Sequence, residues 1–357
     1  MAKISTVENL KARMSAAVNT NAERLYVDLK ALDIDLAPLS WWRKEWKAGN
    51  KQVQKQLIEK IIRIESKHHD NQIVAFKFND VQNDYHFKRT RRNVVLKSRQ
   101  QGISTYELAF DLCEAILFSG RNIRLVPHDP DAEDEFFNRL NIMYENLPAK
   151  FQAATKYKSK ERFHFHDLSK GVSNSIITSL NPRPGQEHKL RSQTITNAHI
   201  TELPFWAGDQ EKVFTALMSA AEKGVITIES TAGGKEKFYF YYSQGKKKRG
   251  GWTSFFYEWW WLRENRIKDC RFAKVGNSFV LLHPDESILD FIDEGNFKGL
   301  SGFEKLESYK KVKEIQVTEK EIEVCEKIFE HLKRLKYVDK NASWHNSEVA
   351  EYLGWRR

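Results

Sequence analysis

Residues 93–105 bring several groups that could bind a phosphate chain into one short stretch. An apolar run, Val94–Leu96, leads into a polar turn and Gly102, and Ser104 and Thr105 then open a helical pattern. A turn between a strand and a helix points backbone N–H groups and the positive end of the helix at one place, where phosphates bind. The hydroxyl of Ser104 would be placed to bind Mg²⁺. The stretch therefore predicts a site for ATP and Mg²⁺.

The loop departs at two positions from GxxxxGK[ST], the usual pattern of phosphate-binding turns. Ile103 stands at the lysine position, and Lys97 replaces the first glycine. A cation is still needed, because negative charge on the phosphates grows during transfer. Lys97 could supply it and Arg99 could add a fork of donors, although a basic turn without nucleotide remains the alternative. The predicted nucleotide contacts of the loop are Lys97, Ser98, Arg99, Gln100, Gln101, Gly102, Ile103, Ser104 and Thr105.

The segments around the loop predict an α/β fold. Short β-prone runs alternate with amphipathic segments such as Thr105–Phe118, whose apolar residues share one helical face. Strands separated by helices indicate a mainly parallel central sheet flanked by helices, with its ligand site beyond the carboxyl ends of the strands. The predicted strands are Val94–Leu96, Ile123–Pro127, Ser175–Leu180, Thr194–Thr201, Val225–Glu229 and Thr253–Trp259.

Pattern changes along the chain predict three parts. Residues 1–72 are charged and helical, residues 73–265 carry the α/β core, and residues 266–357 are polar and mostly helical. The clearest helix of the last part is Thr318–Tyr337, which has apolar residues at helical spacing. Both flanking parts are therefore expected to be helical elements around the core.

Composition limits the classes of function. The 357 residues carry a formal charge of +10, which is compatible with a polyanionic partner such as DNA. No run approaches the length needed to cross a bilayer, and the first residues lack the apolar core of a signal peptide. The three cysteines lie far apart in no CxxC pair, which argues against a structural zinc or a disulfide framework. We expect a protein that is neither secreted nor membrane-bound.

The string Lys97–Thr105 resembles the deviant Walker A loop of tailed-bacteriophage terminase large subunits, in which a lysine at the start of the loop commonly replaces the missing one. The resemblance covers roughly residues 73–262. It implies a P-loop NTPase of the RecA/ASCE-like type, an ATP hydrolase that moves double-stranded DNA into a procapsid in the host cytoplasm. It also implies a portal protein, a small terminase subunit and a homo-oligomeric ring as partners.

Residues 76–82 are similar to the motif with which these motors hold adenine, and they place Asn79 and Gln82 at the nucleotide. A primary amide can donate to adenine N7 and at the same time accept from the N6 amino group, which guanine does not allow. An Asn-x-x-Gln string alone is more often the start of a surface helix. Its position about twenty residues before Gly102 favours the adenine interpretation.

Residues 194–206 resemble the Walker B strand of the family. The resemblance assigns Glu202 as the carboxylate that orients and deprotonates the attacking water. Thr201 stands where an aspartate usually helps to hold Mg²⁺. A hydroxyl is a poorer ligand, so the metal would depend more on Ser104 and the phosphates.

Two further strings resemble the family's coupling and trans-acting motifs. A strand at 225–229 precedes Ser230, Thr231 and Ala232, small residues that would sense the γ-phosphate before two glycines. Arg191 precedes the Walker B strand, where an arginine reaches the ATP of a neighbouring subunit in related motors, and Arg183 is the nearest rival.

The remaining expectations concern DNA. Lys246, Lys247, Lys248 and Arg249 form a charge run that would contact DNA phosphates. The nuclease part of a large subunit is expected to be absent, because the chain ends shortly after Trp355. Two alternatives stay open. One is a non-hydrolysing DNA-binding or assembly subunit, motivated by Ile103 and Thr201, and the other is a helicase-type translocase on single strands.

Overall fold

The computed structural model describes most of the chain between residues 37 and 352. The described residues are 37–66, 71–180, 194–206, 210–233, 237–262, 271–275, 278–284, 312–335, 337, 338, 343, 344, 349, 350 and 352. The chain forms two compact units, Met1–Tyr257 and Glu258–Arg357. The division into three parts at residues 72 and 265 stays a prediction.

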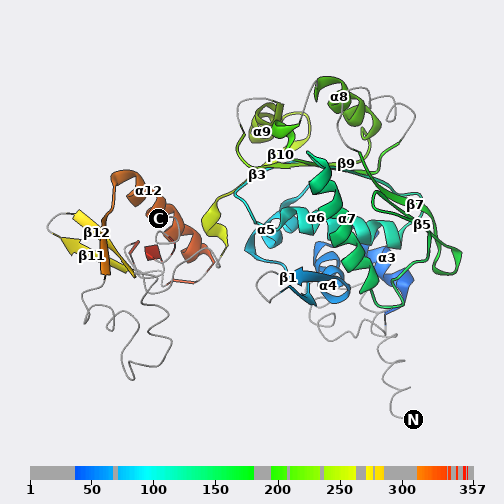
Figure 1. The fold of residues 1–357 in the computed structure, drawn as a ribbon, viewed down its shortest axis with the longest axis horizontal. Coiled ribbons are helices and arrows are strands. Elements are labelled where there is room, and N and C mark those ends of the chain that lie inside the picture. Colours follow the sequence, from blue (N-terminus) through cyan, green and yellow to red (C-terminus); the bar gives the residue numbers. More distant parts are fainter. Residues whose placement is uncertain are drawn as a thin grey trace, which may run out of the picture. The chain divides into compact units, whose positions relative to one another are not determined.

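An eight-stranded sheet forms the centre of the first unit, in the order β10-β3-β9-β8-β4-β7-β6-β5 (Figure 1). Strands β10 to β7 of this order run parallel to one another, and β6 and β5 are each antiparallel to their neighbours. The strands are β3 (Arg92–Lys97), β4 (Asn122–Val126), β5 (Thr155–Lys158), β6 (Arg162–Asp167), β7 (Val172–Ser179), β8 (Asn197–Thr201), β9 (Val225–Ser230) and β10 (Trp252–Tyr257).

Helices cover both faces of this sheet (Figure 1). One side carries α5 (Asp80–Lys88), α6 (Ile103–Leu117) and α7 (Pro130–Glu145), and the other carries α8 (Gln210–Ala220) and α9 (Lys237–Lys246). Two earlier helices, α3 (Leu39–Lys47) and α4 (Lys51–Ile61), pack on the α5–α6 side. The predicted α/β architecture, a mainly parallel central sheet flanked by helices, is confirmed.

The antiparallel strands β5 and β6 of this unit were not predicted from the sequence. β6 alternates buried Phe163 and Phe165 with more exposed Arg162 and His164, the period of a strand with one covered face. Its six residues end at a tight turn, so the apolar pattern is too short to stand out. Outside the main sheet, β1 (Arg63–Ser66) and β2 (Gln72–Ala75) form a two-stranded antiparallel pair.

The described residues of the second unit contain strands as well as the predicted helix. α12 (Glu319–Arg334) agrees with the predicted helix, but β11 (Arg271–Val275), β12 (Ser278–Pro284) and β13 (Val312–Gln316) form a three-stranded antiparallel sheet. The signal was the Gly276-Asn277 pair between two short β-prone runs, a dipeptide typical of hairpins. A polar composition concealed it, since strands with one solvated face carry many charged residues.

A small core belongs to this second unit. It contains Trp260, Cys325, Ile328, Phe329, Leu332, Val349, Ala350 and Tyr352.

Within the described part of the chain, every helix is too short or too polar to cross a bilayer.

Candidate nucleotide site

The loop between β3 and α6 has the backbone of a phosphate cradle. Gly102 adopts φ +77°, the left-handed region that favours glycine, and α6 begins at the next residue. A Cβ at this position would lie 2.5 Å from Nε2 of Gln82, so a side chain could not be added without a shift. At the start of the loop the Ser98 N–H donates to the Tyr257 carbonyl (3.1 Å), which ties the loop to β10. The first N–H groups of α6 are thus free of intrahelical partners at the carboxyl end of β3.

Asn79 and Gln82 both hold this loop through their side-chain amides. They form a capping box at the start of α5, in which each side chain accepts from the other residue's backbone N–H. Their NH₂ groups donate onward, from Asn79 to the Gln101 carbonyl (3.2 Å) and from Gln82 to the Gly102 carbonyl (2.8 Å). The structure therefore brings this pair next to the loop, as the adenine interpretation requires, while contact with the base itself stays a prediction.

The remaining loop residues divide into buried and exposed groups. Ile103 and Gln101 are fully buried, whereas Arg99 and Gln100 are exposed. A fully buried isoleucine has no charge to offer, so any cation for the phosphates has to come from elsewhere in the site. Thr105 accepts a hydrogen bond from Nη1 of Arg139 on α7 (3.2 Å), an arginine that sequence reasoning did not single out.

Lys97, at the carboxyl end of β3, lies between two carboxylates. Its Nζ is 3.7 Å from Oε1 of Glu202 and 3.7 Å from Oε2 of Glu229. The Lys97 side chain is largely buried, with 10% of its surface exposed. An amine held this way is fixed beside the loop without a tight hydrogen bond to either acid. It is available to a more strongly charged anion.

Glu202 joins this cation to the coupling strand. Its Oε2 accepts from the Ser230 hydroxyl (2.8 Å), the Thr231 N–H (3.1 Å) and the Thr231 hydroxyl (3.1 Å). Glu202 itself has φ +48°, an uncommon left-handed conformation for a residue with a side chain. The bend turns its carboxylate from the end of β8 toward β9. Sequence-predicted residues from β3, β8 and β9 thus meet at one edge of the sheet.

The rest of the coupling segment packs on the turn after Glu202. A Cβ on Gly233 would lie 2.7 Å from Cβ of Pro204 and 3.0 Å from Cζ of Phe205, so only glycine allows this close approach. Ala232 is exposed beside it. A change at Glu202 would therefore alter the position of the segment that follows β9.

Glu229 is one of the residues of the site that sequence reasoning missed. It lies on β9 with 1% of its surface exposed, and its backbone is the register partner of Thr201 on β8. Adjacent parallel strands point register partners to the same face, so a carboxylate lies beside the hydroxyl where an aspartate was expected. The only sequence signal was a charged residue inside the apolar run 225–229.

His199 completes this group from β8. Its Nε2 lies 2.9 Å from Oε1 of Glu229, and both side chains are buried. Burial opposes charging of either group, yet the charges and hydrogen bonds within the group outweigh it. The Lys97 ammonium and the His199 imidazole lower the pKa of Glu229 below its usual range, with a contribution from the Ser104 hydroxyl. The hydrogen bond and the charge of Glu229 raise the pKa of His199.

The donors present suit Mg²⁺. Oε2 of Glu229 is buried and accepts no hydrogen bond from the described residues, and the hydroxyl of Ser104 adjoins this carboxylate. Carboxylate and hydroxyl oxygens are the ligands this hard cation prefers, and it keeps waters and phosphate oxygens for its other positions. Among the described residues no three His, Cys, Asp or Glu side chains cluster as a metal site, which is compatible with a metal held mostly by phosphates and water.

Several predicted site residues lie away from this edge or outside the described residues. Arg183 and Arg191 fall in the undescribed range 181–193. Lys246, Lys247, Lys248 and Arg249 are exposed where α9 ends and the chain turns into β10. Because β10 runs parallel to β3, this turn lies at the amino-terminal edge of the sheet, opposite the phosphate loop.

Comparison with protein-family models found no match, and no curated protein matches the chain. Among solved structures, the chain is similar to the ATPase domain of the large terminase of Thermus phage P74-26 (17% identity, TM-score 0.40), with 54% of this chain and 86% of that one covered. A point mutant of the same domain gives 18% identity and a TM-score of 0.42 over the same shares.

The chain is also similar to the large terminase of bacteriophage HK97, with 14% identity and a TM-score of 0.45. That match covers 58% of this chain and 43% of the HK97 protein, so the chain corresponds to less than half of that relative. With identities and TM-scores this low, the function rests on the residues of the site.

Proposed function

We propose that the chain hydrolyses ATP and acts as the motor ATPase that moves double-stranded DNA into a viral procapsid. The observation that carries the proposal is the position of Glu202, which contacts Ser230 and Thr231 through one oxygen and lies 3.7 Å from Lys97 through the other. A carboxylate beside a phosphate loop can act as a base. Because it is also hydrogen-bonded to residues of the next strand, a change in its charge alters those hydrogen bonds. Cofactors of the proposed reaction are ATP and Mg²⁺.

The residues have separate roles in this proposal. Backbone N–H groups at Gly102–Thr105 and the Lys97 ammonium bind the phosphates, and Arg99 is exposed beside them. Glu202 orients the attacking water and accepts its proton, which contributes typically 10²–10⁴-fold. Ser104 and Glu229 would hold Mg²⁺, with Thr201 alongside. When bound, the metal neutralises charge that develops on the phosphates.

Coupling would start at Glu202. Protonation of its carboxylate, or loss of the phosphate beside it, weakens the acceptor for Ser230 and Thr231. The segment from Ser230 to Gly233 could then shift against Pro204 and Phe205, which it touches. This gives a physical route from hydrolysis to movement of a surface segment.

The wider assembly follows only from the family resemblance. It comprises a homo-oligomeric ring on a portal protein, a small terminase subunit, duplex DNA, and the host cytoplasm as location. Arg191 of one subunit would reach the ATP of the next, with Arg183 as the rival. An arginine supplied in trans is worth roughly 10³–10⁵ in rate. Mixing Arg191→Ala with Glu202→Gln chains tests this, because some mixed interfaces would pair an intact base with an intact arginine and regain activity.

A non-hydrolysing DNA-binding subunit is the second candidate. The full burial of Ile103 at the lysine position favours it, as does the engagement of both amides of Asn79 and Gln82 in the loop itself. A helicase-type enzyme shares the adenine and coupling motifs. Strand-separation assays distinguish that activity from translocation on duplex DNA.

Steady-state phosphate release with and without linear duplex DNA tests the proposal. We expect slow release by the chain alone and faster release with duplex DNA. Binding of an ATP analogue without turnover, under both conditions and at raised protein concentration, would favour the non-hydrolysing candidate. No binding at millimolar ATP would contradict both. Nuclease activity is not expected, and intact linear DNA after the assay checks this.

A further inference from the structure

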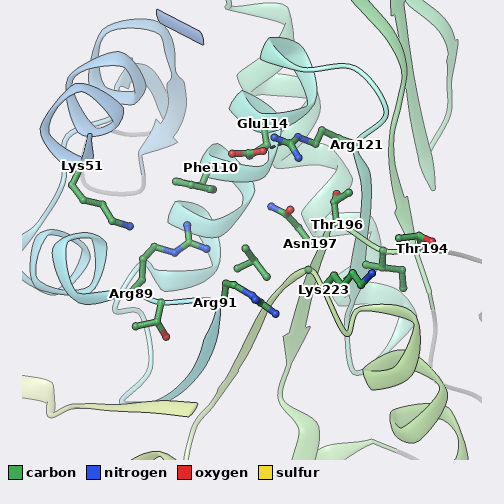
Figure 2. A pocket seen from close by; sticks show the side chains of 14 residues that line it. Lys51, Arg89, Arg91, Phe110, Glu114, Arg121, Thr194, Thr196, Asn197 and Lys223 are labelled. Carbon is green, nitrogen blue, oxygen red and sulfur yellow. Dashed lines mark ion pairs between the residues drawn. The ribbon is translucent and has the colours of Figure 1, made fainter. Parts of the chain in front are cut away.

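A pocket of about 380 Å³ opens at the edge of the sheet opposite the phosphate loop (Figure 2). Arg91 precedes β3, Thr196 precedes β8 and Gly224 precedes β9, and all three line the pocket. These strands are parallel, so their amino-terminal ends form one edge and their carboxyl ends, with Lys97 and Glu202, form the other. The pocket is therefore distinct from the nucleotide site.

Basic side chains dominate the lining. Figure 2 shows Lys51 and Arg89 extending from one side of the pocket, with Arg121 and its partner Glu114 across from them. Glu114 is the one acidic residue that lines it. We call the site the basic pocket and define it by five side chains, Lys51, Arg89, Arg91, Arg121 and Lys223.

Two of these five charges are already neutralised. Arg89 pairs with the buried Glu107 on α6 (3.1 Å), and Arg121 pairs with Glu114 (2.9 Å). The described residues provide no carboxylate partner for Lys51, Arg91 or Lys223. Three positive charges thus line the pocket without an ion pair to a carboxylate from the part of the chain that is described.

Lys51 shows the consequence of this arrangement. Burial and the charge of Arg89, opposed by the charge of Glu107, together lower the pKa of its ammonium to about 8. A half-buried lysine beside an arginine is unfavourable unless an anion joins them. The electrostatics of the pocket therefore favour an anion.

The charge continues from the pocket along the same edge. β3 and β10 are neighbours there, with Arg92 as register partner of Trp252 and the hydroxyls of Thr90 and Thr253 3.1 Å apart. The exposed basic turn from Lys246 to Arg249 leads into β10. A polyanion that enters the pocket would therefore meet further cations beside it.

We propose that the basic pocket binds a phosphoryl group. Separate ammonium and guanidinium groups with threonine hydroxyls match the several charged oxygens of a phosphate better than the two of a carboxylate. The group could belong to the backbone of duplex DNA or to a free phosphorylated small molecule. The inference rests on the proposed function only for DNA as the source.

The test compares two double charge reversals of equal size. Arg91→Glu with Lys223→Glu alters the rim of the pocket, and Lys156→Glu with Lys160→Glu alters exposed lysines at the far edge strand β5. Binding of a labelled linear duplex by anisotropy, and of pyrophosphate by calorimetry, is measured on the full chain without ATP. Lys97→Ala is measured in parallel, because it removes the cation of the nucleotide site instead.

We expect the rim variant to lose at least roughly tenfold in affinity for one probe, while the β5 variant retains most of its affinity for both. Lys97→Ala should retain most of its affinity for the duplex and lose only the pyrophosphate binding that occurs at the phosphate loop. Loss of duplex binding assigns backbone phosphates, and the milder Arg91→Gln with Lys223→Gln should lower the salt slope by about 2. Loss of pyrophosphate binding alone assigns a free phosphoryl ligand. Equal losses in the rim and β5 variants, or binding that depends on Lys97 alone, would overturn the proposal and leave the ATPase proposal standing.

Discussion

The two faces of strands β3, β8 and β9 differ in chemistry, although alternate residues of the same strands form them. The face toward α6 carries Asn93, Lys97, Asn197, His199, Thr201, Thr227 and Glu229, and the face toward α8 and α9 carries Val94, Leu96, Ala198, Ile200, Ile226 and Ile228. Alternation of this kind follows from the two-residue period of a strand. Strands buried on both faces usually read as continuous apolar runs.

Many of the polar groups on the α6 face have polar partners within the protein. Glu107 of α6 accepts from Tyr85 (2.6 Å) and Thr227 (3.2 Å) and pairs with Arg89, and Asp111 accepts from Asn197 (2.8 Å). Buried polar groups at this density are costly unless each finds a partner. The apolar face therefore stabilises the fold by packing. The polar face carries groups that extend from the edge of the sheet at the candidate nucleotide site toward the opposite edge.

Among the substitutions at the polar face, Glu202→Gln is expected to have the largest effect on activity. The amide keeps the hydrogen bonds' geometry but cannot take a proton, so turnover should fall by roughly 10²–10⁴. ATP-analogue binding should persist. Single-turnover phosphate release and analogue binding measure the two effects separately. Near-normal hydrolysis by the variant would remove Glu202 from the mechanism.

Glu229→Gln tests the buried carboxylate of the same face. It removes one charge beside Lys97, Ser104 and Thr201 without changing volume. We expect activity to fall by roughly 10–100-fold and the Mg²⁺ concentration for half-maximal nucleotide binding to rise. Titration with Mn²⁺ followed by electron paramagnetic resonance gives a readout independent of turnover. An unchanged metal dependence would restrict Glu229 to a packing role.

Asp111→Asn examines the interior of the polar face through pH. Burial and the nearby Glu107 raise the pKa of Asp111 to about 7, against about 4 in an unfolded chain. The folded state therefore holds this proton while the unfolded state loses it, and the stabilising contribution is lost as pH rises from about 4 through 7. The loss is about 1.4 kcal/mol for each unit of pKa difference.

The asparagine variant lacks that loss, so its stability relative to the parent chain should rise between pH 4 and 7. Denaturant unfolding at several pH values measures it. Asp134→Asn, at an exposed position of α7, serves as the control and should follow the parent chain. Parallel curves for Asp111→Asn and the parent would contradict the burial argument.

Ile228→Val is the smallest change and tests the apolar face next to Glu229. Ile228 is fully buried against α8 and α9, so loss of one methylene should cost about 0.5–1.5 kcal/mol of unfolding free energy. The activity of the folded protein should stay the same. A drop in activity comparable to that of Glu229→Gln would show that the two faces are not separable.

Local pattern was enough to predict the sheet strands around the loop, helix α6 and the glycine at its start, because each depends on a few adjacent residues. It also placed Glu202, Ser230 and Thr231 at strand ends, which a parallel sheet gathers at one edge. Glu229 escaped because its role depends on the register of β9 beside β8, which no single segment encodes. The Asn79-x-x-Gln82 string was ambiguous for the opposite reason: a capping box and a base-binding motif use the same amides.

The sharing of Lys97 by Glu202 and Glu229 has a consequence for ligand affinity. The lysine serves as a counter-ion of two acids, so a phosphate chain that draws it away leaves Glu202 without a cation and Glu229 with His199 alone. A divalent cation then gains two negative neighbours that it lacked before. Nucleotide and metal should consequently strengthen each other's binding by the same factor, since thermodynamic linkage is reciprocal. In Lys97→Ala both acids lack this cation from the start, and that mutual enhancement should shrink.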